Sequence, residues 1–130
     1  MSKRREVDVL LTRSRQFLET AEHQYGRGFY DLAAFSLEQS LQLYLKAKLV
    51  EYGVDYPRTH SVRRLLELLG EVLPSESGRK NVNALVEELL LELGMLEDAY
   101  ITSRYFLREF RREEVEKMMT TVRRVMELVR

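Results

Sequence analysis

Apolar residues recur at helical spacing through most of the chain. Between residues 5 and 25 an apolar side chain falls at every third or fourth position, which is the spacing of one helix face. The segment 29–52 is apolar on more than one face, as is typical of a helix at the centre of a bundle or at a subunit contact. Gly26 and Gly28 precede it and Gly53 follows it. The pattern predicts two long helices joined by a short connection.

Three further apolar stripes follow. They predict helices over 61–73, from 81 to about 100, and over 112–129. The stretch PSESGRKN, rich in loop-forming residues, is expected to be a loop before the fourth helix. No segment alternates as a strand does. The sequence therefore predicts an all-α fold, a single domain over 1–130, built as an up-and-down bundle of about five helices.

Composition narrows the class of protein. The chain has 130 residues, with 21 basic and 21 acidic side chains and no cysteine. A neutral chain argues against a broad nucleic-acid surface, although a local basic patch remains compatible with it. The absence of cysteine excludes disulfides and thiol catalysis. No apolar run reaches the roughly 20 residues that cross a bilayer, and the charged start does not resemble a signal peptide. A cytoplasmic protein without membrane contact is expected.

The two histidines do not form a recognisable catalytic or metal site. A carboxylate-bridged di-iron bundle needs Glu-x-x-His pairs, but Thr20 stands three residues before His23 and Pro57 three before His60. Ser61 follows His60 without the G-x-S-x-G elbow of a serine hydrolase. Glycine-rich phosphate-binding loops are also absent. We therefore expect no metal, no cofactor and no catalytic residue.

His60 stands where a polar turn becomes a leucine-rich helix, in DYPRTHSVRRLLELLG. Thr59 and Ser61 beside it are candidate caps for that helix. A helix start presents free N–H groups and partial positive charge, so it could bind an anion or a phosphate. The alternative interpretation is structural, with His60 pinning the loop to a neighbouring helix.

A second candidate region is the arginine-rich stretch SRYFLREFRREE. It carries Arg104, Arg108, Arg111 and Arg112. Arginine forks suit phosphate groups, and Tyr100 and Tyr105 could stack on a base. The alternative is a set of solvated charges that pair with nearby carboxylates, namely Glu109, Glu113 and Glu114.

Three segments together resemble the HEPN domain family: DLAAFSLEQSLQLYLKAKLVEYG, PRTHSVRRLLELL and AYITSRY. The resemblance implies a small all-α bundle, commonly a homodimer, with a nucleotide-binding role. It also implies a minimal nucleotidyltransferase partner in a two-component, often toxin–antitoxin, system. His60 and Arg104 become the main candidates for a shared phosphate or nucleotide site, with Arg58, Tyr105 and Arg108 as further candidates.

Some HEPN proteins are metal-independent ribonucleases with an Arg-x(4–6)-His motif, in which histidine acts as general acid or base and arginine stabilises phosphate charge. Here the motif is incomplete, because the positions after Arg104 that would hold histidine are Glu109, Phe110 and Arg111. His60 follows Arg58 by two residues, which is too close. Ribonuclease activity is thus an alternative that this motif does not support.

Besides the nucleotide- or partner-binding module and the ribonuclease, a third hypothesis is that the chain is a structural interaction protein. YGRGFYDLAAFSLEQSLQLYLKA has the rhythm of a tetratricopeptide helix pair. Such repeats recur at about 34 residues, and no second copy follows in the sequence. Self-association is a separate expectation, because the apolar second helix and the methionine-rich last helix could each cover a partner surface.

Overall fold

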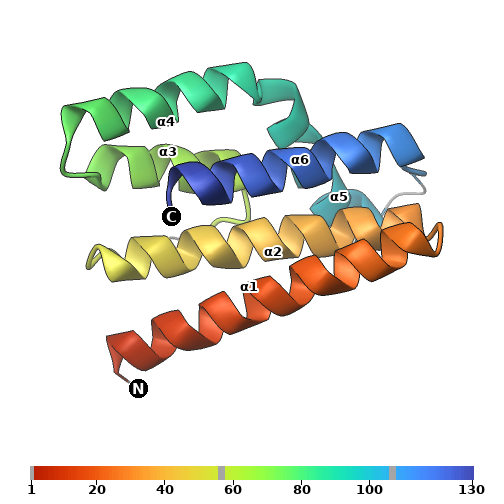
Figure 1. The fold of residues 1–130 in the computed structure, drawn as a ribbon, viewed down its shortest axis with the longest axis horizontal. Helices are drawn as coiled ribbons and strands as arrows, with labels where there is room; N and C mark the ends of the chain where they lie inside the picture. Colours follow the sequence, from red (N-terminus) through yellow and green to blue (C-terminus); the bar gives the residue numbers. More distant parts are fainter. Residues whose placement is uncertain (1, 56–57, 106–107) are drawn as a thin grey trace.

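The computed structural model describes residues 2–55, 58–105 and 108–130, with the side chains of 101–105 set aside. This part of the chain is helical and contains no strand (Figure 1). The helices are α1 (Lys3–Gly26), α2 (Tyr30–Glu51), α3 (Val62–Val72), α4 (Glu76–Glu88), α5 (Leu90–Tyr105) and α6 (Arg112–Leu128). The predicted all-α helical bundle is confirmed.

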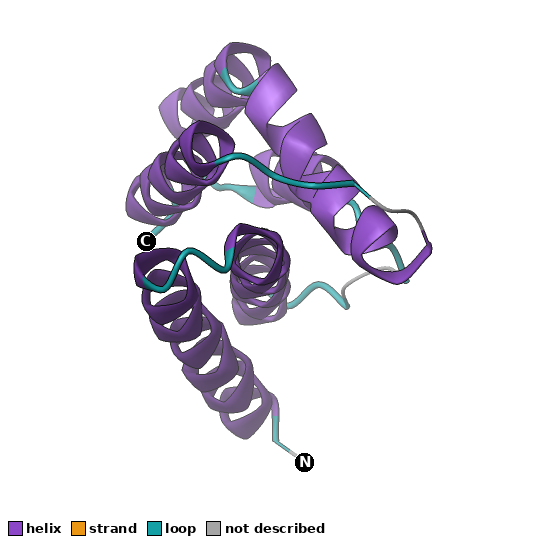
Figure 2. Ribbon diagram, turned by 90° about the vertical axis from the view of Figure 1, so that its right-hand side faces the viewer, coloured by secondary structure: helices purple, strands orange, loops and turns teal. Residues whose placement is uncertain are grey.

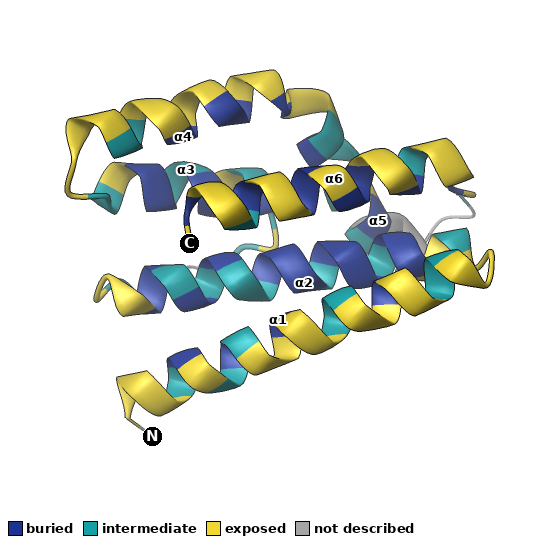
Figure 3. Cartoon of the chain, in the orientation of Figure 1, coloured by how far each residue is buried: buried dark blue, intermediate teal, exposed yellow. Residues whose placement is uncertain are grey.

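Helix α2 lies at the centre of the molecule. It packs against α1, α3, α5 and α6, and its leucines at 37, 41, 45 and 49 are fully buried. In Figure 3 most of α2 is buried or half-buried, whereas α1 and α4 each present a broad exposed face. A helix surrounded on several sides needs apolar residues on several faces, which explains the pattern in its sequence.

Helices α1 and α2 form a tight antiparallel hairpin. Gly28 turns the chain with a φ of +76°, a conformation that glycine adopts without steric cost. Midway along the pair, two buried serines bond reciprocally. Ser14 Oγ donates to the carbonyl oxygen of Ser40 at 2.7 Å, and Ser40 Oγ donates to that of Ser14 at 2.8 Å. These short side chains let the two backbones approach closely.

The connection from α2 to α3 doubles back along α2. Gly53, with a φ of +78°, starts the turn. The chain then returns far enough for His60 to reach Gln42, in the middle of α2. In Figure 1, α3 consequently starts beside the middle of α2 and runs in the same direction as α2. This return is what carries His60 from the end of α2 to a site on its side.

The predicted loop PSESGRKN is mostly helical, which corrects the expectation from its composition. Helix α4 begins at Glu76, and Ser75 is its N-cap, with Oγ accepting from the backbone N–H of Gly78 at 3.0 Å. Asn81, expected at the helix start, lies inside α4. A serine followed by an acidic residue in the first turn is a helix-start signal. Here it outweighs the loop-like character of the glycine and the second serine.

The fourth predicted helix is two helices, so the described chain has six rather than five. The break falls at Leu89, whose φ and ψ are −102° and 21°. Backbone bonding nevertheless continues across it, because Leu93 N donates to Leu89 O at 2.8 Å. The bend keeps Leu89 and Leu93 in the core and leaves Leu91 80% exposed. A continuous apolar stripe could not reveal this change of direction.

Candidate functional site

A stripe of polar residues runs along α2 at four-residue spacing, on a helix that is otherwise apolar. Glu38 is fully buried and Gln42 is 4% exposed, while Lys46 is half-buried. Gln42 Nε2 donates to Glu38 Oε2 at 2.8 Å, and Lys46 Nζ donates to Gln42 Oε1 at 3.0 Å. The side-chain amide thus links a buried carboxylate to an ammonium group nearer the surface.

His60 joins this stripe from the α2–α3 connection. Its Nδ1 lies 3.2 Å from Gln42 Oε1, and its ring stacks on Tyr100 of α5 with centroids 4.6 Å apart and planes 24° apart. The amide oxygen can only accept, so Nδ1 must carry the proton of this bond. The neutral imidazole then has its lone pair on Nε2. The side chain of His60 is exposed overall.

The direction of the Gln42 amide follows from its other partners. The Lys46 ammonium has only donors, so it requires the oxygen of the amide, and an ionised Glu38 has only acceptors, so it requires the nitrogen. Both requirements agree with the observed contacts. One orientation of Gln42 therefore satisfies Glu38, Lys46 and His60 together.

Burial raises the pKa of Glu38 from 4.5 to about 7. Hydrogen bonds from Gln42 and Gln39 and the charge of Lys46 oppose this rise, whereas the charge of Glu97 adds to it. Burial likewise lowers the pKa of Lys46, against the attraction of Glu38. Removing a charged group from water favours its neutral form. The carboxyl of Glu38, which is linked to His60 through Gln42, therefore titrates near neutral pH.

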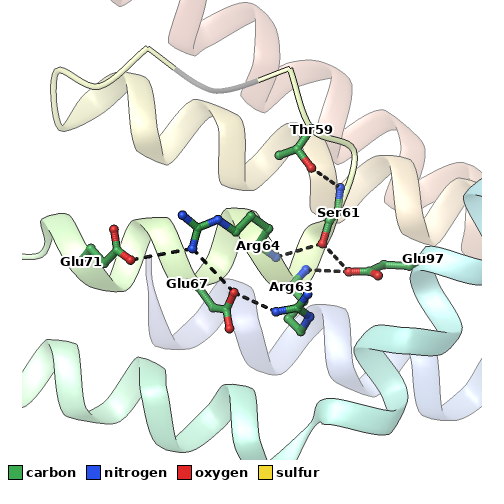
Figure 4. A network of polar contacts seen from close by, with 7 residues as sticks. All are labelled: Thr59, Ser61, Arg63, Arg64, Glu67, Glu71 and Glu97. Carbon is green, nitrogen blue, oxygen red and sulfur yellow. Dashed lines mark hydrogen bonds and ion pairs between the residues drawn. The ribbon is translucent and has the colours of Figure 1, made fainter.

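The start of α3 is capped as the sequence predicted. Thr59 Oγ1 accepts from Ser61 N at 3.1 Å, and Ser61 Oγ accepts from Arg64 N at 3.0 Å. Figure 4 shows a further partner, Glu97 of α5, which points at this helix start. Its Oε1 accepts from Ser61 Oγ at 2.5 Å and from Arg63 N at 3.3 Å.

This arrangement changes the expected role of the helix start. A carboxylate is stabilised at a helix N-terminus by the same N–H groups and dipole that would bind a phosphate. Glu97 already holds that position with its Oε1. The anion at the start of α3 is thus the protein's own carboxylate, and the neighbouring His60 is the more accessible candidate for a ligand.

The other predicted site residues fall in different settings. Arg58 is exposed, two residues before His60. Arg104 and Tyr105 belong to the last turn of α5, but their side chains lie outside the described residues. Tyr100, which stacks on His60, stands four residues before Arg104 in the sequence. The proposed meeting of His60 and Arg104 remains a prediction.

Arg108 is engaged at the beginning of α6. Its Nη2 donates to Glu114 Oε2 at 2.8 Å, and its guanidinium lies 4.0 Å from the ring centroid of Phe110. Pairing with a nearby carboxylate was the alternative interpretation of this arginine. In the described part of the chain its Nη1 is buried without a hydrogen-bond partner. These contacts hold Arg108 against the beginning of α6, and its role in ligand binding stays a prediction.

Sequence reasoning missed four residues of the cluster: Glu38, Gln42, Lys46 and Glu97. The first three carried a usable signal, because polar residues at i, i+4 and i+8 share one helix face and here interrupt an apolar helix. Glu97 gave no such signal, since its role depends on how α5 meets α3.

The described residues hold no group of three or more His, Cys, Asp or Glu side chains that could bind a metal ion. None of their helices combines the length and apolar character that crossing a bilayer requires.

The chemical capacity of the cluster follows from these contacts. His60 offers an exposed, protonatable imidazole held against an aromatic ring. The Lys46 ammonium shares the Gln42 oxygen with it, so two cationic groups can lie side by side when His60 is protonated. An anionic group with a planar part would find both charge and an aromatic edge here.

Comparison with known proteins gave one match. The HEPN domain family model matches residues 7–130, nearly the whole chain. The chain matches no curated protein and no solved structure.

Proposed function

The chain belongs to the HEPN domain family, and on that premise we propose that it is a nucleotide-binding or partner-binding module. It acts with a minimal nucleotidyltransferase in a two-component, toxin–antitoxin-like system, and His60 is the centre of its ligand site. The observation that carries the proposal is the contact of His60 with both Gln42 and Tyr100. Family membership supports the nucleotide-related role, and this contact supports its location.

The cluster supports nucleotide binding through charge and shape together. Lys46 and a protonated His60 supply positive charge at one amide oxygen, and Arg58 is exposed on the adjoining connection. Phosphate groups are held by such cations through charge-assisted hydrogen bonds. Arg104 and Tyr105 follow Tyr100 by four and five residues, and the proposed site includes both as partners of a phosphate or a base. The overall charge of the chain is zero, so binding depends on this local group.

Isothermal titration tests the nucleotide role. ATP, AMP and inorganic phosphate are titrated into the wild type, into His60→Ala and into His23→Ala. His23 is the other histidine of the chain and lies exposed in the last turn of α1, so it is a matched control. We expect His60→Ala to weaken binding at least about tenfold, the effect of losing one charged hydrogen bond, and His23→Ala to leave it unchanged. Absence of heat with every nucleotide would contradict the nucleotide role and leave the partner role.

Arg104 is tested in the same titration. If Arg104 and His60 hold the same ligand, the effects of Arg104→Ala and His60→Ala on the binding free energy will not add in the double variant. Additive effects would mean that the two residues do not share a site. Arg79→Ala is a suitable control, because Arg79 bonds the carbonyl of Leu73 at the α3–α4 turn.

The partner role and the ribonuclease alternative need separate experiments. Co-purification with a nucleotidyltransferase encoded beside this chain tests the first, and light scattering at micromolar concentration tests the proposed homodimer. For the alternative, the protein is incubated with total RNA in EDTA. We expect intact RNA, because the arginine–histidine spacing of the ribonuclease motif is absent.

A further inference from the structure

A groove of about 500 Å³ opens between α1 and α6, and α2 contributes Tyr44 and Lys48 to its lining. Helices α1 and α6 both pack on α2, and the Arg123–Glu22 ion pair at 3.0 Å joins them across the groove. Toward its N-terminus α1 diverges from α6, as Figures 1 and 2 show, but it stays packed on α2 through Val7 and Leu10. The volume lies within the range of small-molecule sites, roughly 300–1,000 Å³. We call this space the α1–α6 groove.

The α1–α6 groove is separate from the His60 cluster. Among the residues of α2, Tyr44 and Lys48 line it, whereas Gln42 and Lys46 face His60 and its partners. Two residues along a helix correspond to about 200° of rotation. The groove and the cluster therefore occupy nearly opposite sides of α2.

The floor of the groove is apolar. Leu11, Leu18 and Met126 line it, each half-buried. They contact the edges of the two core clusters that α1 covers. Both hydroxyls of the lining have partners. Tyr44 OH donates to the carbonyl oxygen of Met126 at 3.1 Å, and Ser14 Oγ donates to that of Ser40 at 2.7 Å. Leucine and methionine side chains adapt to a flexible aliphatic body, so the floor fits an alkyl chain.

Cationic side chains outnumber carboxylates in the lining of the groove. Among the lining residues, Glu127 is the single carboxylate. The cationic lining residues are Arg15, Lys48, Arg123 and Arg130. Two of these have partners, because Lys48 lies 3.4 Å from Glu51 and Arg123 pairs with Glu22.

The other two cations are available to a ligand. Arg15 and Arg130 are exposed, and neither side chain makes a hydrogen bond or an ion pair with any residue in the described ranges. Burial raises the pKa of Tyr44, the charge of Glu51 adds to the rise, and the charge of Arg130 opposes it. Arg15 and Arg130 thus supply positive charge in the lining of the groove.

We propose that the α1–α6 groove binds an amphipathic anion, an unbranched alkyl chain that ends in a carboxylate. The chain lies on Leu11, Leu18 and Met126, and the head group pairs with Arg15 and Arg130. Charge complementarity selects this occupant, because a neutral or cationic head group would leave these two arginines without a partner. The proposal does not depend on the nucleotide-binding role of the His60 cluster.

The full chain carries five methionines, so ¹³C-methyl labelling gives a small set of resolved NMR signals. Met126 lines the groove, whereas Met118 is fully buried in the core and serves as an internal reference. Octanoate is the probe, with octylammonium and acetate as controls that lack the negative head or the alkyl chain. We expect octanoate to shift the Met126 signal in a saturable way without moving Met118, and we expect neither control to do so.

Charge-reversal variants complete the test. Arg15→Glu is expected to weaken octanoate binding at least tenfold, and Arg13→Glu, an exposed change two residues away on the same helix, is expected to leave it unchanged. Lys48→Gln, expected to weaken binding severalfold, is used if Arg15→Glu shifts the Met118 signal and so disturbs the core. Equal shifts with octylammonium, or equal weakening by Arg13→Glu, overturn the proposal. A Met126 shift that follows protein concentration without octanoate overturns it in favour of a second copy of the chain.

Discussion

The Nδ1 atom of His60 lies 3.2 Å from the Oε1 atom of Gln42, whose Nε2 atom bonds the buried carboxylate of Glu38 at 2.8 Å. This relationship makes the protonation pattern of an exposed imidazole depend on a group in the core. Glu38 fixes the direction of the amide, and the amide fixes which ring nitrogen of His60 carries the proton.

Replacing Gln42 by leucine should change the ratio of the two neutral tautomers of His60. In the wild type at pH 8 we expect the neutral imidazole to be protonated at Nδ1, because Gln42 Oε1 accepts there. In Gln42→Leu this acceptor is absent, so the Nε2-protonated form should increase. Nitrogen NMR of the imidazole rings measures the ratio. The exposed His23 is the internal control, and an unchanged ratio at His60 would contradict the proposed orientation.

Glu38 should make the stability of the protein depend on pH. Its pKa is raised to about 7 in the fold, above the ordinary 4.5. A raised pKa means that the contribution to stability is present below about pH 4.5 and is lost as the pH rises through 7. Between pH 5 and 8 we expect the unfolding free energy of the wild type to fall by about 2–3 kcal/mol relative to Glu38→Gln. Urea unfolding at several pH values measures this difference.

The glutamine variant has no carboxyl at position 38, so its own curve serves as the control for all other titrating groups. The comparison concerns the change with pH and not the absolute stability of either protein. Parallel curves for the two proteins would show that Glu38 is not shifted in the fold.

The central position of α2 could be predicted because a helix with apolar residues on several faces must bury more than one of them against neighbours. The cap at Ser61 could be predicted for a different reason. N-capping depends only on residues that are close together in the sequence. The bend at Leu89 could not, because leucines on both sides of it continue one apolar stripe. The start of α4 was missed where Ser75 acts as a cap inside a segment that reads as a loop.

For the candidate site, too, the sequence indicated single residues but not the contacts between residues far apart along the chain. His60 stood out in the sequence as one of two histidines, but its partners come from elements far apart along the chain. Gln42 is 18 residues before it, and Tyr100 belongs to α5. Only the return of the chain along α2 brings these three side chains together, and that path is not encoded in any single periodic pattern.

Alanine substitutions at Gly70 and Gly94 should change the free energy of unfolding in opposite directions. At Gly70 of α3 a Cβ atom would lie 2.9 Å from Cγ1 of Val82, on the facing helix α4. At Gly94 of α5 nothing lies within 4 Å of the same position. We expect Gly94→Ala to raise the unfolding free energy by about 1 kcal/mol through helix propensity. Gly70→Ala should lower it by about 1–3 kcal/mol through overpacking.

Thermal or urea unfolding of both variants checks this pair. A Gly70→Ala, Val82→Ala double variant should recover part of the loss, because the smaller side chain on α4 leaves room for the new methyl group. A stabilising effect of Gly70→Ala alone would show that α3 and α4 can separate without cost.

Ser61 and Glu97 should be energetically coupled. Ser61 Oγ both caps α3 and donates to Glu97 Oε1 at 2.5 Å, and Glu97 also accepts from Arg63 N. Each alanine substitution should cost about 1–2 kcal/mol. In the double variant the loss should be smaller than the sum by at least about 0.5 kcal/mol, as for residues in one network. A denaturant double-mutant cycle measures the coupling, and simple additivity would mean that Glu97 does not support the cap.

The reciprocal bonds between Ser14 and Ser40 also bear on how the protein comes apart. If α1 slid along α2, each buried hydroxyl would lose its carbonyl acceptor, and an unsatisfied buried polar group costs about 1–3 kcal/mol. Shear between the two helices is thus opposed by both serines at once. Separation of α1 should begin instead at its N-terminal end and proceed by peeling, one turn at a time, until it reaches this pair. The two serines therefore limit how far local unfolding of α1 can proceed from its N-terminus. In hydrogen exchange, the amide protons of α1 around Ser14 should exchange more slowly than those near Lys3.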